Sequence, residues 1–140
     1  MTNDGELRPL FRRHLPEFDW QSIETGLTGG GVPDSNFCRS GVEGWVEHKQ
    51  TAGWVCSLRP EQVGWIMRRV RNGGRVWVAV RRRAPEGPRR ASADELWVVH
   101  GRYAVEAKAG GLRAVEPHAQ VWHNGPGAWD WRAIGKLLVS

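Results

Sequence analysis

Two acidic residues and one lysine have the spacing expected of a shared site. Twelve residues separate Asp34 from Glu47, and Lys49 follows two positions later. Residues two apart on a β-strand project from the same face, so Glu47 and Lys49 would lie roughly 6–7 Å apart along it. A short turn between two strands would bring Asp34 beside Glu47.

Such a trio predicts hydrolytic chemistry that depends on a metal ion. Two converging carboxylates repel each other and favour a divalent cation between them, and hard oxygen ligands with open water positions suit Mg²⁺. We expect Asp34, Glu47 and the backbone carbonyl of His48 to be the metal ligands, with Mn²⁺ able to substitute. Lys49 could then orient a metal-bound water or help to deprotonate it, and could offset charge on a phosphate.

Four segments must position these residues. Alternating residues predict strands over 32–38 and 44–50, with a turn at 41–44 between them. Pro60 opens a helix over 60–72, since proline suits the first helical position. A continuous apolar run at 75–81 indicates a buried strand of the parallel type, so strand, helix and strand would form a crossover unit.

The rest of the chain shows weaker patterns. We expect a short amphipathic helix at 6–14, a strand at 20–25, a glycine-rich loop at 26–31 and an arginine-rich loop at 82–93. Two further strands at 96–99 and 102–107 would form a hairpin, 110–111 would be a turn, and Asp130 would cap a last helix at 131–139.

Length and composition are those of one globular domain. The chain has 140 residues, of which 40% are hydrophobic and 25% charged. No apolar run is long enough to cross a membrane, and the polar, acidic start is unlike a signal peptide. Cys38 and Cys56 have neither disulfide-framework nor zinc-ligand spacing, which favours reduced thiols and a cytoplasmic protein.

The charge is concentrated in the middle of the sequence. Residues 59–90 contain ten arginines against Glu61 and Glu86, although the whole chain carries only +5. Arginine binds phosphate through two parallel hydrogen bonds, so this segment suggests a polyanionic partner, with a merely solvated basic face as the alternative. The candidate DNA contacts are Arg59, Arg68, Arg71, Arg81, Arg82, Arg83, Arg89 and Arg90.

Four short motifs occur in one order over residues 29–82. They are Gly29-Gly30-Gly31 leading into Val32-Pro33-Asp34, then Glu47-x-Lys49, then Arg59-Pro60-Glu61-Gln62 opening a helix, and Val80-Arg81-Arg82 ending a strand. Together they resemble the PD-(D/E)xK nuclease superfamily, in the VRR-NUC and Holliday-junction-resolvase branch found in phages and prophages. Residues 83–140 carry no part of the resemblance.

The resemblance implies a restriction-endonuclease-like α/β core. It consists of a mixed central sheet flanked by helices, here with an extra C-terminal hairpin and helix. The chain would be a single nuclease domain, with its catalytic core at about 20–82 and an accessory or dimerisation part at about 94–140. It also implies that Gln62 reaches the active site, unless it only caps its helix, and that an upstream glutamate joins in. Glu24 is the first choice, with Glu6 and Glu17 as alternatives.

The expected activity is Mg²⁺-dependent hydrolysis of phosphodiester bonds in branched DNA, as in a Holliday junction resolvase. A twofold dimer would place one site on each strand to be cut, and the tryptophan-rich C-terminal half could form its interface. The glycine run precedes a strand rather than a helix, so no nucleotide cofactor is expected. Three alternatives remain: a monomeric flap, end or single-strand nuclease of the same fold, a non-catalytic DNA-binding module, and a basic interaction domain.

Overall fold

The computed structural model describes residues 4–23 and 30–140. Its centre is a six-stranded sheet in which the strands follow one another in chain order. The strands are β1 (Asp19–Ser22), β2 (Ser35–Arg39), β3 (Val42–Thr51), β4 (Val76–Ala84), β5 (Ala93–His100) and β6 (Gln120–Trp122). Only β3 and β4 run parallel, because a helix connects them. All other neighbouring strands are antiparallel.

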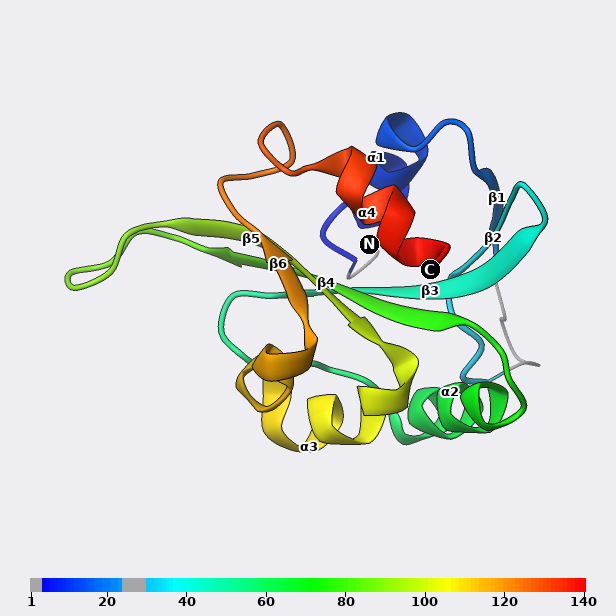
Figure 1. The fold of residues 1–140 in the computed structure, drawn as a ribbon. Coiled ribbons are helices and arrows are strands. Elements are labelled where there is room, and N and C mark those ends of the chain that lie inside the picture. Colours follow the sequence, from blue (N-terminus) through cyan, green and yellow to red (C-terminus); the bar gives the residue numbers. More distant parts are fainter. Residues whose placement is uncertain (1–3, 24–29) are drawn as a thin grey trace.

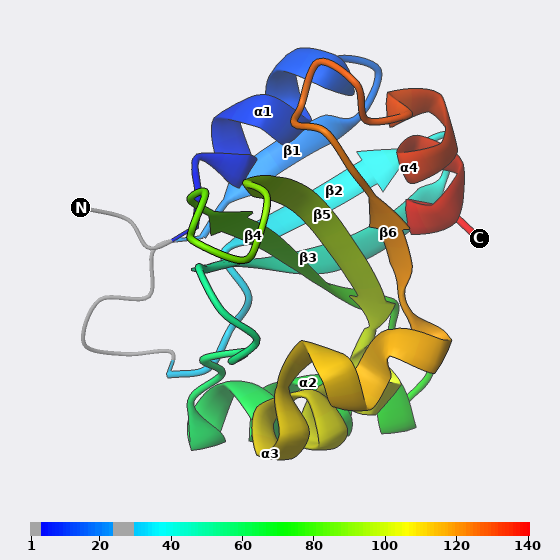
Figure 2. The ribbon, with the colours of Figure 1, turned by 90° about the vertical axis from the view of Figure 1, so that its left-hand side faces the viewer.

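Helices cover both faces of the sheet (Figure 1, Figure 2). One face carries α1 (Leu7–His14) and α4 (Trp131–Leu138), and the other carries α2 (Pro60–Arg71) and α3 (Ala104–Val115). The short 3₁₀ helices η1 (Gly101–Tyr103) and η2 (Glu116–His118) flank α3. Among the described residues, no helix combines the length and apolar character needed to cross a bilayer.

Each face of the sheet buries its own apolar core. Alternate residues of β4 divide between the cores: Trp77 and Ala79 pack under α1 and α4, while Val76, Val78 and Val80 pack against α2 and α3. A strand buried on both faces reads as one continuous apolar run, which is why its sequence predicted a parallel strand correctly. The expected mixed sheet flanked by helices is therefore confirmed.

The predicted elements around the candidate site are largely confirmed. The helices α1, α2 and α4 begin and end within one or two residues of their expected bounds, and the Asp130 side chain caps α4 by accepting the Ala133 N–H at 3.0 Å. The turn expected at 41–44 lies earlier, because Ser40 and Gly41 both adopt positive φ, at 49° and 82°. Two such residues form the tight hairpin turn that matches strand twist, so β3 can begin at Val42.

Three predictions for the middle and C-terminal parts are wrong. Residues 82–93 are not simply a loop, because β4 continues to Ala84 and β5 begins at Ala93. Residues 102–107 are not a strand, so the expected hairpin at 96–107 does not exist, and 110–111 is a kink within α3, where Gly111 has φ 71°. The buried residues of α3 recur at helical spacing, which outweighs the local alternation. They are Ala104, Ala107, Gly111, Leu112 and Val115.

Candidate active site

The two acidic residues meet where β2 and β3 separate. The last paired residues of these strands are Ser35 and Val46, so Asp34 and Glu47 occupy the next position on each chain. The backbone carbonyl of Asp34 accepts a hydrogen bond from the Ile23 N–H at 2.9 Å, which continues the pairing with β1 by one residue. The strand β2 itself begins only at Ser35, so residues 32–34 are not part of it, contrary to the prediction. Asp34 and Glu47 thus flank the opening beyond the last β2–β3 pair.

The Asp34 carboxylate is held by its neighbours across that opening. Its Oδ2 accepts the backbone N–H of His48 at 3.0 Å, and its Oδ1 lies 2.6 Å from Nδ1 of the His48 ring. The Ser35 hydroxyl donates to the same Oδ1 at 3.1 Å. One residue in an antiparallel arrangement directs its N–H and C=O to the same side, so the His48 carbonyl also lies on the side of Asp34. That is the side on which the sequence predicts a metal ligand.

The His48 side chain lies on the face of β3 opposite Lys49, as strand alternation requires. It is fully buried on the α1 face, with its ring edge-on to Phe11 at 4.7 Å between centroids. The sequence did not indicate its contact with Asp34. Its Nε2 is buried with no hydrogen-bond partner. A proton on Nε2 would be an unsatisfied donor, so we assign the proton to Nδ1, from which it is donated to Asp34.

Glu47 projects from the opposite face of β3 into the space between the sheet and α2. Its side chain is 6% exposed, and its Oε2 accepts a hydrogen bond from Gln62 Nε2 at 3.1 Å. Lys49 Nζ lies 3.5 Å from the same oxygen, as two residues sharing one strand face should. The structure thus brings together Glu47, Lys49 and Gln62, with Asp34 next to them directly before β2.

The Glu47 carboxylate is strongly perturbed. Burial, followed by the negative charge of Asp34, raises its pKa to about 7 from an ordinary 4.5, against the opposing effects of Lys49 and His48. Burial disfavours the charged form of an acid, and so does a second carboxylate nearby. Such a shift in a group beside two other titratable residues is typical of a functional site.

Gln62 has both of the roles that the sequence left open. Its Oε1 accepts the N–H of Arg59 at 2.9 Å, which closes the first turn of α2, and its Nε2 reaches Glu47. The glycine run also contacts this turn, since a Cβ on Gly31 would lie 2.1 Å from the Glu61 carbonyl oxygen. Gly31 has φ 92°, so glycine is required for both reasons. The close approach fixes the segment before Asp34 against the start of α2.

The connection from β3 to α2 brings to the candidate site a residue that the sequence did not indicate as part of it. Cys56 is buried close enough to Lys49 and Glu47 for their charges to affect the pKa of its thiol, which Lys49 lowers and Glu47 raises. Burial raises the pKa of its thiol to about 11, so the group stays protonated and poorly nucleophilic. The helix α3 holds this connection in place, with Lys108 Nζ donating to the Leu58 carbonyl at 2.8 Å. No motif marks Cys56, because its position depends on α3.

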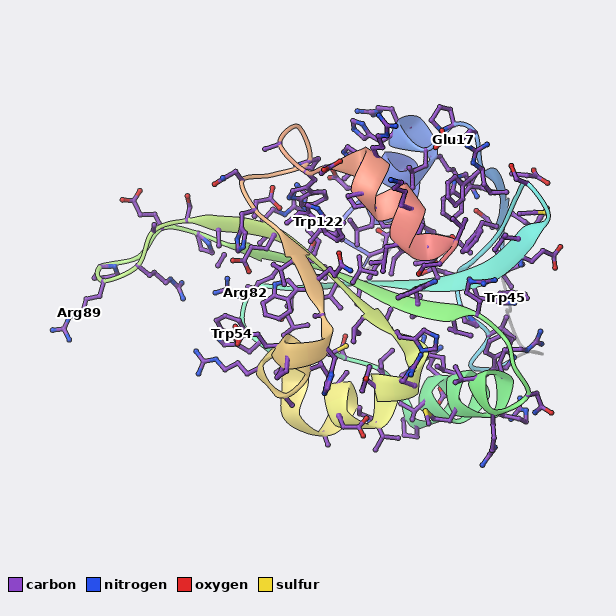
Figure 3. The ribbon with its side chains drawn as sticks, in the orientation of Figure 1. Glu17, Trp45, Trp54, Arg82, Arg89 and Trp122 are labelled. Carbon is purple, nitrogen blue, oxygen red and sulfur yellow. The ribbon has the colours of Figure 1, made fainter. Side chains whose placement is uncertain are left out.

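The three upstream glutamates proposed to complete the site are Glu24, Glu17 and Glu6. Glu24, the first choice, lies outside the described residues. Glu17 is exposed near the start of β1, whose Asp19 pairs with Cys38 at the end of the sheet opposite Asp34 (Figure 3). Glu6 is exposed at the start of α1, which covers the face of β3 opposite Glu47. The described contacts therefore bring neither alternative to Glu47.

The predicted DNA-binding arginines fall into two groups. Arg81 is 5% exposed and pairs with Asp94 through two hydrogen bonds, at 2.8 and 2.7 Å. Arg82 pairs with Glu95 at 3.0 Å and stacks on Trp54 (Figure 3). These two side chains are occupied within the protein, so we remove them from the candidate DNA surface. The others are exposed, although Arg59 pairs with Glu61 and Arg83 donates to Gln50: Arg59, Arg68 and Arg71 at α2, and Arg83, Arg89 and Arg90 at and beyond the end of β4.

The carboxylates of Asp34 and Glu47 fit the Mg²⁺ that the resemblance implies. They do not make a complete metal site from side chains alone. Within residues 4–23 and 30–140, no group of three histidine, cysteine, aspartate or glutamate side chains could hold a metal ion. Mg²⁺ needs fewer side-chain ligands than three, because it keeps several waters and is commonly held by one or two carboxylates plus the substrate phosphate. Asp34 and Glu47 supply such a pair, and their mutual repulsion favours a cation.

Comparisons with known proteins add no relatives. No family model matches the chain, and no curated protein matches it.

Proposed function

We propose that this protein is a metal-dependent nuclease that hydrolyses phosphodiester bonds in branched DNA. The observation that carries the proposal is the buried Glu47 carboxylate. It lies beside Asp34, has a pKa of about 7, and contacts both Lys49 and Gln62. The motif order and the arginine-rich segment support a nucleic-acid substrate. The restriction-endonuclease-like core is part of the same proposal.

Each of the residues has a role. Bound Mg²⁺ would polarise the scissile phosphate and lower the pKa of a water ligand. Asp34 and Glu47 would hold the ion, with His48 fixing the orientation of Asp34 and Gln62 that of Glu47. The Lys49 ammonium would orient the attacking water and offset negative charge on the phosphate.

The proposed branched substrate implies that the protein acts as a dimer. A four-way junction offers two equivalent strands to cut, so a twofold dimer would place one site at each. Light scattering over micromolar concentrations tests this part separately. A monomer throughout would favour a flap or end-processing nuclease with the same site.

The activity is tested with labelled four-way, flap, duplex and single-stranded DNA in Mg²⁺, Mn²⁺ or EDTA. We expect cleavage of branched DNA with either metal and none in EDTA. Asp34→Asn and Lys49→Met should each lower the rate by about a thousandfold or more while still binding DNA. Glu106→Gln, a change of an exposed carboxylate on α3, is the matched control. Absence of cleavage of all four substrates, or full activity of Asp34→Asn, would contradict the proposal.

A further inference from the structure

The end of β4 and the segment that joins it to β5 extend past the end of β3 as an arm, which we define as residues 83–92. The strand β3 ends at Thr51, opposite Arg82. Past that point Arg83 pairs with Asp94 and Ala84 with Ala93, so β4 has only β5 as a neighbour. Figure 1 shows the arm projecting from the body, and Figure 3 shows Arg89 at its end.

A tight turn closes the arm and presents two arginines. The Gly87 N–H donates to the Arg90 carbonyl at 3.1 Å, and the Arg90 N–H donates to the Gly87 carbonyl at 3.3 Å. Pro88 occupies the position of the turn at which its fixed φ is favourable. Arg89 and Arg90 are exposed, and among the described residues no carboxylate pairs with either of them.

The base of the arm is held rigidly. The Arg81 guanidinium bonds both oxygens of Asp94 and also donates to the Gly5 carbonyl at 2.8 Å. On the other face, Arg82 bonds Glu95 and donates to the Gly53 carbonyl at 2.9 Å. Paired charges and backbone contacts on both faces hold the direction in which the arm leaves the sheet.

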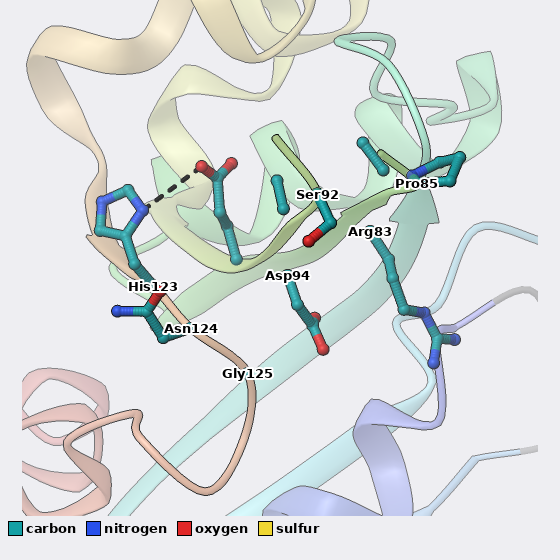
Figure 4. A pocket seen from close by; sticks show the side chains of 10 residues that line it. Arg83, Pro85, Ser92, Asp94, His123, Asn124 and Gly125 are labelled. Carbon is teal, nitrogen blue, oxygen red and sulfur yellow. Dashed lines mark ion pairs between the residues drawn. The ribbon is translucent and has the colours of Figure 1, made fainter. Parts of the chain in front are cut away.

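A hollow of about 630 Å³ lies between the base of the arm and residues 123–125 (Figure 4). Its two carboxylates already have arginine partners, Arg81 for Asp94 and Arg82 for Glu95. They therefore do not oppose the positive charge of the arm. The arm itself carries three arginines, Arg83, Arg89 and Arg90, against Glu86.

The arm leaves the same end of the sheet as the candidate active site. Because β3 and β4 are parallel, Lys49 lies opposite Val80, and the arm follows a few residues later. Six extended residues from Arg82 to Pro88 would span roughly 20 Å at about 3.3 Å each. That length corresponds to roughly six base pairs of duplex at 3.4 Å per pair.

We propose that the arm is a phosphate-binding clamp for duplex DNA, which contacts the substrate roughly six base pairs from the bond to be cut. The location of that bond rests on the proposed function, whereas duplex binding by the arm does not. The substrate would then need a duplex segment of at least that length on one side of the cleavage position. Contact with phosphates alone gives affinity without sequence preference.

The test compares two double variants with the same loss of charge. Arg89→Ala/Arg90→Ala removes the tip of the arm. Arg39→Ala/Arg102→Ala removes two exposed arginines from the opposite end of the sheet, where Arg39 ends β2 and Arg102 follows β5. Binding to a labelled 20-base-pair duplex is measured by fluorescence anisotropy in EDTA over a range of salt concentrations, with circular dichroism as a check of folding.

We expect the arm variant to weaken binding about tenfold and to reduce the slope of log affinity against log salt by about two. The control should change affinity less than about twofold. Equal effects of the two variants, no effect of the arm variant, or no binding by the unchanged protein would overturn the clamp. Arm-dependent binding without cleavage in Mg²⁺ would overturn the nuclease proposal alone. Cleavage with no difference between the variants would overturn the clamp alone.

Discussion

The Nδ1 atom of His48, on β3, lies 2.6 Å from Oδ1 of Asp34, which directly precedes β2 and is 14 positions away in the sequence. The His48 backbone N–H holds the other oxygen of the same carboxylate. Together these contacts fix both the position and the rotation of Asp34. A carboxylate fixed in this way can bind an ion without first losing its own rotational freedom.

The ring contact predicts a specific effect of substitution at His48. His48→Phe keeps an aromatic ring against Phe11 but removes the donor to Asp34. We expect the cleavage rate to fall by about 10- to 100-fold, with the free energy of unfolding changed by less than about 1.5 kcal/mol. His48→Asn restores an N–H donor and should recover part of the rate. Rates for His48→Phe equal to those of the unchanged protein would show that the ring only fills space.

Glu47 predicts a dependence of stability on pH. Because folding raises the pKa of this carboxyl from 4.5 to about 7, its stabilising contribution is complete below pH 4.5 and is lost as the pH rises through 7. The full loss would be about 3 kcal/mol. Glu47→Gln cannot titrate, so the unfolding free energy of the unchanged protein should fall relative to this variant between pH 4.5 and pH 8. Urea denaturation measures this difference, and a constant difference would show that Glu47 is not perturbed.

The two contacts of Gln62 can be separated. Gln62→Glu keeps an oxygen for the Arg59 N–H but replaces the donor to Glu47 with a negative charge. Gln62→Ala removes both contacts and should destabilise the fold by about 1–2 kcal/mol. Relative to the unchanged protein, we expect Gln62→Glu to lose less stability at pH 5, where the two acids can share a proton, than at pH 8. Thermal denaturation of both proteins at both pH values measures this, and an equal loss at both would indicate that Gln62 does not act on Glu47.

Arg81 is predicted to support the fold rather than bind DNA. Arg81→Met leaves Asp94 without its two hydrogen bonds, and we expect a loss of about 2 kcal/mol in the free energy of unfolding. Arg89→Ala should change that free energy by less than about 0.5 kcal/mol, since its side chain is exposed. Chemical denaturation of the two variants tests the contrast. A stable Arg81→Met protein that binds DNA poorly would reverse the assignment.

The elements around Asp34 and Glu47 could be predicted from the sequence because local patterns determine them. Alternation indicated β3, and a proline suited to the first helical position indicated α2. The carboxylate pair followed from the short turn between β2 and β3. The helix α3 was missed because the alternation over residues 102–107 resembled a strand and the glycine pair at 110–111 resembled a turn. The long-range pairs could not be predicted: nothing local in Arg81 distinguishes an arginine that pairs with Asp94 from one that binds phosphate.

The metal-binding step is tested most directly by titrating the protein with Mn²⁺ and following the free ion by electron paramagnetic resonance. The unchanged protein should bind Mn²⁺ saturably in the micromolar to millimolar range, and Mg²⁺ should compete. Asp34→Asn and Glu47→Gln should each abolish this binding. Glu61→Gln, which changes an exposed carboxylate in the first turn of α2, should not. Absence of saturable binding by the unchanged protein, or equal binding by all three variants, would contradict the account.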